Sequence, residues 1–143
     1  MKKFLILLPA VYLCSLLTAC QPPGPSGTML SAADQKAVLA FSEPEIDNML
    51  DGLKTGDYDV FSQDFSEEMR QALPREEFEQ WKKERDARLG WYLRRVVEGM
   101  VHRSDGTYTV IYQASFAFND SVLMRVVFEA DPPHRICSVW FDK

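Results

Sequence analysis

The chain has few of the residues that most often carry catalytic or metal-binding chemistry. It contains three cysteines and two histidines among 143 residues, and two of the cysteines lie within the first 20 residues. The rest of the chain has only Cys137, which excludes an internal disulfide there. One thiol and two histidines do not supply the ligands of the usual zinc sites, so we expect no metal and no cofactor.

The sequence also lacks the short motifs that identify common active sites. It has no glycine-rich dinucleotide loop, no P-loop, no Gly-x-Ser-x-Gly and no His-Glu-x-x-His. Its formal net charge is −5, whereas nucleic-acid binding requires clustered Lys and Arg to neutralise phosphates. We therefore predict no catalytic residue and no nucleic-acid partner.

The first 20 residues have the three parts of an export signal. Lys2 and Lys3 give a positive start, residues 4–17 are mostly apolar, and small residues precede Cys20. The apolar run of about 14 residues is too short to span a bilayer as a helix, which requires about 20. Its last residues, Leu17-Thr18-Ala19-Cys20, resemble the lipobox of bacterial lipoproteins.

The lipobox resemblance implies that residues 1–19 are a signal peptide, cleaved before Cys20. Diacylglycerol on the Cys20 sulfur and an acyl chain on the new N-terminus, palmitate-type lipids, would then hold the protein stably at a membrane. Gln21 stands where Asp would signal retention in the inner membrane, which implies the outer membrane facing the periplasm in a Gram-negative host. The nature of the host stays open, as does an ordinary signal peptide that ends in cysteine.

A linker is expected to follow Cys20. Residues 21–30 are rich in proline and glycine and lack a repeating apolar face, as is typical of flexible segments. We expect residues 20–41 to be the lipidated cysteine and a flexible tether, with at most a turn or two of helix near the end. The folded domain is then predicted to be residues 42–143.

The pattern of caps and apolar positions predicts helices first and strands afterwards. Ser42 predicts a helix start, because Glu45 completes a capping box, and Gly56 predicts the end of that helix. Short helical segments then lead to a helix from Pro74 to Leu89, ended by Gly90. Four strands joined by turns follow, at residues 91–102, 107–118, 122–130 and 135–141.

This order predicts a single α+β domain. Aromatic and aliphatic residues occupy every second position from Tyr108 to Phe118, which indicates a sheet with one buried face. Consecutive hairpin-linked strands form an antiparallel meander, and the helices are expected to pack on one face of this four-stranded sheet.

An ordered series of residues resembles a known fold family. The series is Ile46-Asp47-Asn48-Met49-Leu50, Gly56-Asp57-Tyr58, Phe61, Phe65, Glu77-Phe78 and Leu89-Gly90, before four strands that close on residues 136–141. Over residues 42–142 it is similar to small bacterial domains of the nuclear-transport-factor-2-like, or cystatin-like cone, fold. The resemblance implies a curved sheet that encloses a pocket. It matches no functional motif, and the fold hosts isomerases, dehydratases, binding domains and transport adaptors.

The interior of such a cone is the candidate site. Its predicted lining residues are Trp81, Arg85, Tyr108, Tyr112 and Phe116. Arg85 would bind a carboxylate or phosphate there, or would lie with its stem on apolar surface and its head in water, which the pattern favours. The two tyrosines would act in a pocket or, as the pattern favours, fill the core.

Other titratable residues have structural as well as functional interpretations. Glu98 would be a general base if it pointed inward, but neighbouring arginines favour an ion pair on the outer face. His102 and His134 lie at different hairpin ends and are typical of turn or rim positions. His134 and Cys137 are three apart in a strand, which sends their side chains to opposite faces and disfavours a nucleophilic pair.

These observations favour a lipid-anchored, non-enzymatic binding module of the cell envelope. Its partner would be another envelope protein or a small apolar ligand, in addition to the membrane that holds Cys20. The alternative is a small-molecule pocket protein or an isomerase- or dehydratase-like enzyme that uses the cone interior. A third hypothesis is a homodimer built by pairing sheet faces.

Overall fold

A computed structural model describes residues 27–142 of the protein. The expected signal peptide and the lipidation site at Cys20 lie outside the described residues. Within the described range, no helix is both long enough and apolar enough to cross a membrane.

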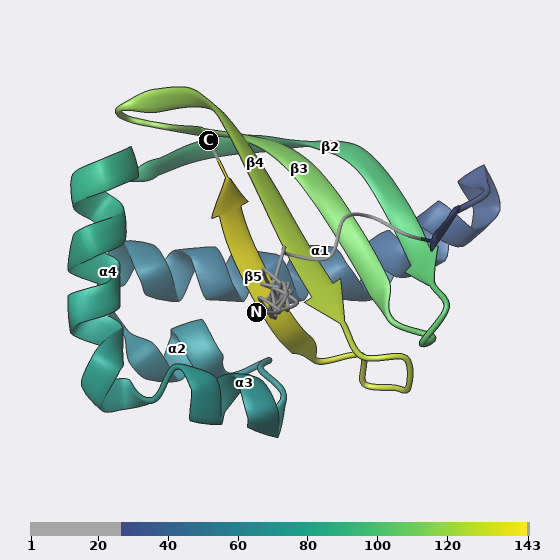
Figure 1. Ribbon diagram of the computed structural model, residues 1–143, viewed down its shortest axis with the longest axis horizontal. Helices are drawn as coiled ribbons and strands as arrows, with labels where there is room; N and C mark the ends of the chain where they lie inside the picture. The colour runs from purple at the N-terminus through teal and green to yellow at the C-terminus, as the bar shows by residue number, and fades with distance from the viewer. Residues whose placement is uncertain (1–26, 143) are drawn as a thin grey trace, which may run out of the picture.

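The described chain is an α+β domain, as predicted. Its helices are α1 (Ala32–Thr55), α2 (Tyr58–Ser62), α3 (Glu67–Ala72) and α4 (Arg75–Leu89). Its strands are β1 (Gly27–Met29), β2 (Tyr92–Arg103), β3 (Tyr108–Phe116), β4 (Asn119–Phe128) and β5 (Ile136–Asp142). The strands form one antiparallel sheet in the order β1-β2-β3-β4-β5. The sheet curves across α1, and α4 stands beside it on the β5 side (Figure 1).

The predicted helix start at Ser42 is wrong. Helix α1 begins at Ala32, where the Ser31 hydroxyl caps it by accepting from the backbone N–H of Asp34. The buried stripe runs through Val38 and Ser42 to Ile46, so packing extends the helix N-terminally by several turns. Pro44 lies inside this helix; its missing N–H removes one helical bond, and the burial of the stripe outweighs that loss.

The tether prediction is likewise wrong for residues 27–41, because they belong to the folded domain. Gly27–Met29 pairs antiparallel with residues 101–103 of β2, so the sheet has five strands rather than four. A Cβ atom on Gly27 would lie 2.4 Å from a methyl group of Val101 and 2.5 Å from the His102 carbonyl oxygen. Glycine is therefore required for this close pairing, although in the sequence it is typical of a linker.

The other boundaries follow the predicted caps closely. Gly56 has a φ of 78° at the end of α1, and Gly90 ends α4. The four predicted strands are confirmed, with one shift: β4 already begins at Asn119, so the turn lies at residues 117–118. Register shifts interrupt the pairing of β2 with β3 between Val97 and Gly99, which explains why residues 91–102 do not alternate cleanly.

The core lies between the concave face of the sheet and α1. From β3, Val110, Tyr112, Ala114 and Phe116 are fully buried in this core. A cluster of aromatic rings continues the core towards α4. Phe61 of α2 packs on Phe65 and on Phe78 of α4, with ring centroids 4.8 and 4.6 Å apart. This cluster fixes α4 at the β5 edge of the sheet.

Candidate functional site

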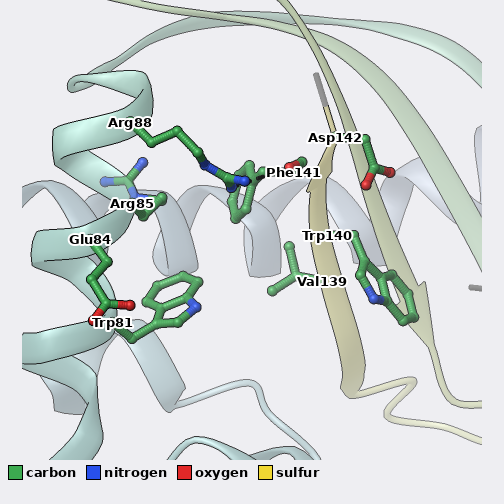
Figure 2. A pocket seen from close by; sticks show the side chains of 8 residues that line it. All are labelled: Trp81, Glu84, Arg85, Arg88, Val139, Trp140, Phe141 and Asp142. Atoms are coloured by element: carbon green, nitrogen blue, oxygen red, sulfur yellow. Dashed lines mark hydrogen bonds between the residues drawn. The ribbon is translucent and has the colours of Figure 1, made fainter.

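The strongest candidate site is a groove of about 450 Å³ between α4 and β5 (Figure 2). Helix α4 forms one wall, and the last residues of β5 form the other. The lining residues are Trp81, Glu84, Arg85, Arg88, Val139, Trp140, Phe141 and Asp142.

Helical periodicity brings the α4 residues to this groove. Trp81, Arg85 and Arg88 are four and three positions apart, so they share one face of the helix. Phe78 and Leu89 on neighbouring turns are buried and hold that face against the sheet. Trp81 lies 6.4 Å from Phe141, ring centroid to ring centroid, and gives the groove an apolar floor.

Arg85 is the unusual residue of the groove. It is 5% exposed, and its guanidinium lies 5.5 Å from the ring centroid of Phe116 and 5.9 Å from that of Phe141. Its Nη2 atom pairs with the Asp86 carboxylate, but its Nε and Nη1 atoms have no hydrogen-bond partner among the described residues. A buried cation with unfilled donors is costly, and an anion would satisfy it.

The charge state of Arg85 supports an electrostatic role. Burial lowers the pKa of its guanidinium, while the neighbouring Asp86 carboxylate opposes that shift. An arginine keeps its proton in proteins, so the positive charge remains at physiological pH. The groove therefore has a positive charge buried in its wall, which favours a carboxylate or a phosphate over a neutral group.

The other charged residues of the groove have partners. Arg88 is exposed, and its Nη2 atom donates to the Phe141 carbonyl oxygen at 3.4 Å. The carboxylate of Glu84 accepts from Gln80, and that of Asp142 accepts from Arg125. The two acidic groups are thus bound elsewhere, while Arg88 can turn towards an anion at the cost of one long hydrogen bond.

The structure separates the five residues predicted to line one pocket. Trp81 and Arg85 line the α4–β5 groove, and Phe116 lies behind Arg85 as an aromatic wall. Tyr112 lies elsewhere and is fully buried. Tyr108 is at the opposite end of β3 from Phe116. Sequence periodicity put all three β3 residues on one face correctly, but it carried no information on which helix covers each.

Tyr112 belongs to a polar network that ties α1 to the sheet. Its hydroxyl donates to Glu43 Oε1 at 2.6 Å, and Arg95 Nη2 donates to Glu43 Oε2 at 2.6 Å. Arg95 also pairs with Asp47 at 2.8 Å. Burial and the Glu43 carboxylate raise the pKa of Tyr112, so this hydroxyl stays protonated. The network fixes the helix on the sheet.

Tyr108 packs between the two histidines. Its ring centroid lies 4.8 Å from that of His102, in a stacked arrangement, and 5.8 Å from that of His134. His134 Nδ1 lies 3.0 Å from the Glu129 carbonyl oxygen. The histidines lie at different hairpin ends, as predicted, and tertiary packing on Tyr108 and Phe41 orders them there.

The structure also shows the surroundings of Glu98 and Cys137, for which the sequence left a functional interpretation open. Glu98 is exposed. Cys137 is half-buried, its thiol donates to the Val127 carbonyl oxygen, and burial raises its pKa to about 11. A thiol with so high a pKa is a poor nucleophile at neutral pH.

Sequence reasoning missed several parts of the site. Arg88 lies seven residues after Trp81 and could have been placed on the same helix face by spacing alone. The contribution of Val139 and Phe141 had no local signal, because it depends on α4 packing beside the last strand.

A titratable residue outside the groove was also missed. Glu45 was interpreted only as a capping residue. Burial and the nearby Asp64 carboxylate instead raise its pKa to about 7.

The described residues contain no group of three or more Cys, His, Asp or Glu side chains arranged to hold a metal ion. No family model, no curated protein and no solved structure matches this chain.

Proposed function

We propose that this protein is a lipid-anchored binding module of the bacterial cell envelope, and that it binds a carboxylate-bearing partner in the α4–β5 groove. The anchoring part rests on Leu17-Thr18-Ala19-Cys20, which follows an export-signal pattern. In a Gram-negative host, Gln21 favours the outer membrane, with the domain in the periplasm.

The binding part rests on one observation above all. The Arg85 guanidinium is buried in the wall of a groove with two of its nitrogen atoms lacking a hydrogen-bond partner among the described residues. An incoming carboxylate would accept from these donors, and charge-assisted hydrogen bonds of this kind are about twice as strong as neutral ones. Trp81 and Phe141 would contact the apolar part of the same partner.

We also propose that the domain has the cystatin-like cone fold of the nuclear-transport-factor-2-like family. The long helix α1 under a curved antiparallel sheet supports this assignment, as do the bulges in β2 that bend the strand. The ligand site would then lie at the β5 edge of the cone rather than in its interior, where Tyr112 and Phe116 are fully buried.

Site-specific photo-crosslinking in the cell envelope tests the binding proposal. A photoreactive residue at Glu84, on the groove, should give a discrete adduct, and one at the exposed Gln71 of α3 should not. Arg85→Met should abolish the Glu84 adduct, whereas Arg94→Met, at an exposed position of β2, should leave it unchanged. An adduct that persists in Arg85→Met would show that the groove arginine does not bind the partner.

A further inference from the structure

Strand β5 is only partly covered along the edge that faces away from β4. At its first residue, Ile136, the segment after α2 occupies this edge: Ser66 N donates to Ile136 O at 2.8 Å, and Ile136 N donates to Asp64 O at 2.9 Å. These bonds form a short parallel bridge between Phe65 and Ile136. Farther along β5 the neighbour is helix α4, which cannot pair with β5 as a strand would.

The direction of the backbone groups shows which residues remain open at this edge. The Phe141 carbonyl oxygen accepts from the Arg88 side chain, so it points towards α4. Backbone groups of alternate residues in a strand point to the same side, so the N–H and C=O of Val139 also point towards α4. A register shift puts an extra residue into β5 between Ile136 and Ser138, so Ile136 and Val139 face away from β4 although they are three positions apart. Residues 138–141 all have register partners in β4. By the same alternation, the backbone groups of Ser138 and Trp140 point towards β4, opposite Val127 and Arg125, and those of Val139 and Phe141 do not.

This open edge forms one wall of the groove that contains Arg85. The groove therefore combines unpaired strand groups, a buried cation and an apolar side chain, which are three features that an extended peptide uses. Trp81 borders Val139 as well as the groove, while Arg85 and Arg88 both contact Phe141. The cations thus lie towards the C-terminal end of β5.

We propose that an extended peptide with a free C-terminal carboxylate adds to β5 as a parallel strand, and that its carboxylate binds Arg85 and Arg88. The parallel direction follows because the cations lie at the Phe141 end, and it continues the pairing that Phe65 begins at Ile136. Val139 and Phe141 would each exchange backbone bonds with the peptide, and Arg88 would leave the Phe141 carbonyl for the carboxylate. This assignment rests on the proposed function and names its partner class.

The charges of the groove also predict a preference within the peptide. Glu84 and Asp142 lie on the groove with their carboxylates already bound to neighbours. They disfavour acidic side chains near the end of the peptide, while the terminal carboxylate is drawn to Arg85. Apolar side chains before the terminus would pack on Trp81.

A peptide-selection experiment on the full-length chain in mild detergent tests the proposal. The probe is a pool of random octapeptides with free C-termini, passed over the immobilised protein, and the retained peptides are then resynthesised with amidated C-termini. We expect amidation to weaken binding at least tenfold, and Arg85→Met to weaken binding of the free acids equally. Arg94→Met should have no effect.

Backbone pairing requires a separate measurement. In NMR hydrogen exchange, a retained peptide should slow the amides of Val139 and Phe141, whereas Trp140 should not change because it already pairs with β4. The peptide can also be methylated at alternate backbone nitrogens, in two versions, with the protein unchanged. Binding should be lost when the methylated nitrogens are those that face β5, and kept when they are the nitrogens that face away.

Three results would overturn the proposal. Equal binding of amidated and free peptides would show that the terminal carboxylate is not recognised. An unchanged hydrogen-exchange rate of the Val139 amide would show that the peptide does not pair with β5. If no peptide is retained but benzoate quenches tryptophan fluorescence in an Arg85-dependent way, strand addition is wrong while the proposed function stands. Absence of any Glu84 adduct in the protein that keeps Arg85, or persistence of the adduct in Arg85→Met, would instead contradict the proposed function itself.

Discussion

At the scale of single residues, the binding role proposed for Arg85 conflicts with the stability of the fold. The Arg85 cation is buried, and within residues 27–142 only Asp86 neutralises it directly; Asp86 also pairs with Lys82. Removing the cation does not leave Asp86 without a partner. Replacing a buried charge by an apolar side chain of similar length is often neutral or stabilising in such surroundings.

We therefore expect Arg85→Met to leave the free energy of unfolding unchanged or to raise it by about 1 kcal/mol. Arg85→Ala should lower it by about 2 kcal/mol, because the stem that packs on Phe116 and Phe141 is lost. Urea denaturation of both variants measures this contrast. A loss in Arg85→Met as large as that in Arg85→Ala would mean that the charge itself holds the fold.

Glu45 gives the protein a pH-dependent stability. Its pKa is raised to about 7, first by burial and then by Asp64, with a smaller contribution from Glu129 and an opposing one from Arg135. The folded state thus holds the Glu45 proton more tightly than the unfolded chain. The stabilisation from this group is complete at pH below its unfolded pKa and is lost as the pH rises to about 7.

Glu45→Gln should remove this dependence. We expect the variant and the wild type to have similar melting temperatures near pH 4, and the variant to melt higher near pH 8. Glu79→Gln, at an exposed position of α4, is the matched control and should follow the wild type. A difference in melting temperature between wild type and Glu45→Gln that stays constant across this pH range would contradict the role of Glu45 in the pH dependence.

At the scale of elements, sequence signals located the end of α1 and both ends of α4, but not the beginning of α1. Gly56 and Gly90 end helices as expected, because a left-handed residue has few alternatives to glycine. Ser42 and Glu45 have the spacing of a cap, yet they lie inside α1, since Val38 already belongs to the buried stripe. Local capping energies of about 1 kcal/mol are smaller than the burial of such a stripe.

The junction of α1 with α2 depends on a glycine within the helix. A Cβ atom on Gly52 would lie 2.2 Å from the backbone nitrogen of Phe61. Gly52→Ala should therefore lower the free energy of unfolding by more than 2 kcal/mol, roughly the cost of overpacking a core, although alanine is the better helix former by about 1 kcal/mol. Ala37→Gly, at an exposed position of the same helix, should cost only about 1 kcal/mol. Chemical denaturation should show this ranking, and a stabilised Gly52→Ala would contradict it.

Strand β1 and the groove could not be predicted from the sequence, because both depend on segments that are distant along the chain. Gly27–Met29 has no apolar alternation, and its pairing depends on the distant strand β2. The groove requires α4 and β5, which are separated by three strands along the chain. The types of residue that line it were partly identified, because Trp81 and Arg85 share a helix face, but their neighbours across the groove come from tertiary packing alone.

At the scale of the whole molecule, the proposed anchor can be tested independently of the groove. Cys20→Ser removes the sulfur that would carry diacylglycerol, and the remaining signal is too short to span a bilayer. We expect the variant to move from the membrane fraction to the soluble fraction. Retention in the membrane fraction, without palmitate labelling of the wild type, would contradict lipid anchoring.

The pairing of β1 with β2 has a mechanical consequence for a domain held at its N-terminus. Tension on residue 27 is transmitted along the axis of β1, because Gly27, Thr28 and Met29 lie antiparallel to residues 101–103 and Leu30 N bonds to Met100 O. The hydrogen bonds between β1 and β2 then share the load in shear and are not broken one after another. A partner held at β5, the opposite edge of the sheet, would be pulled through all five strands, so the sheet itself becomes the element that bears the force.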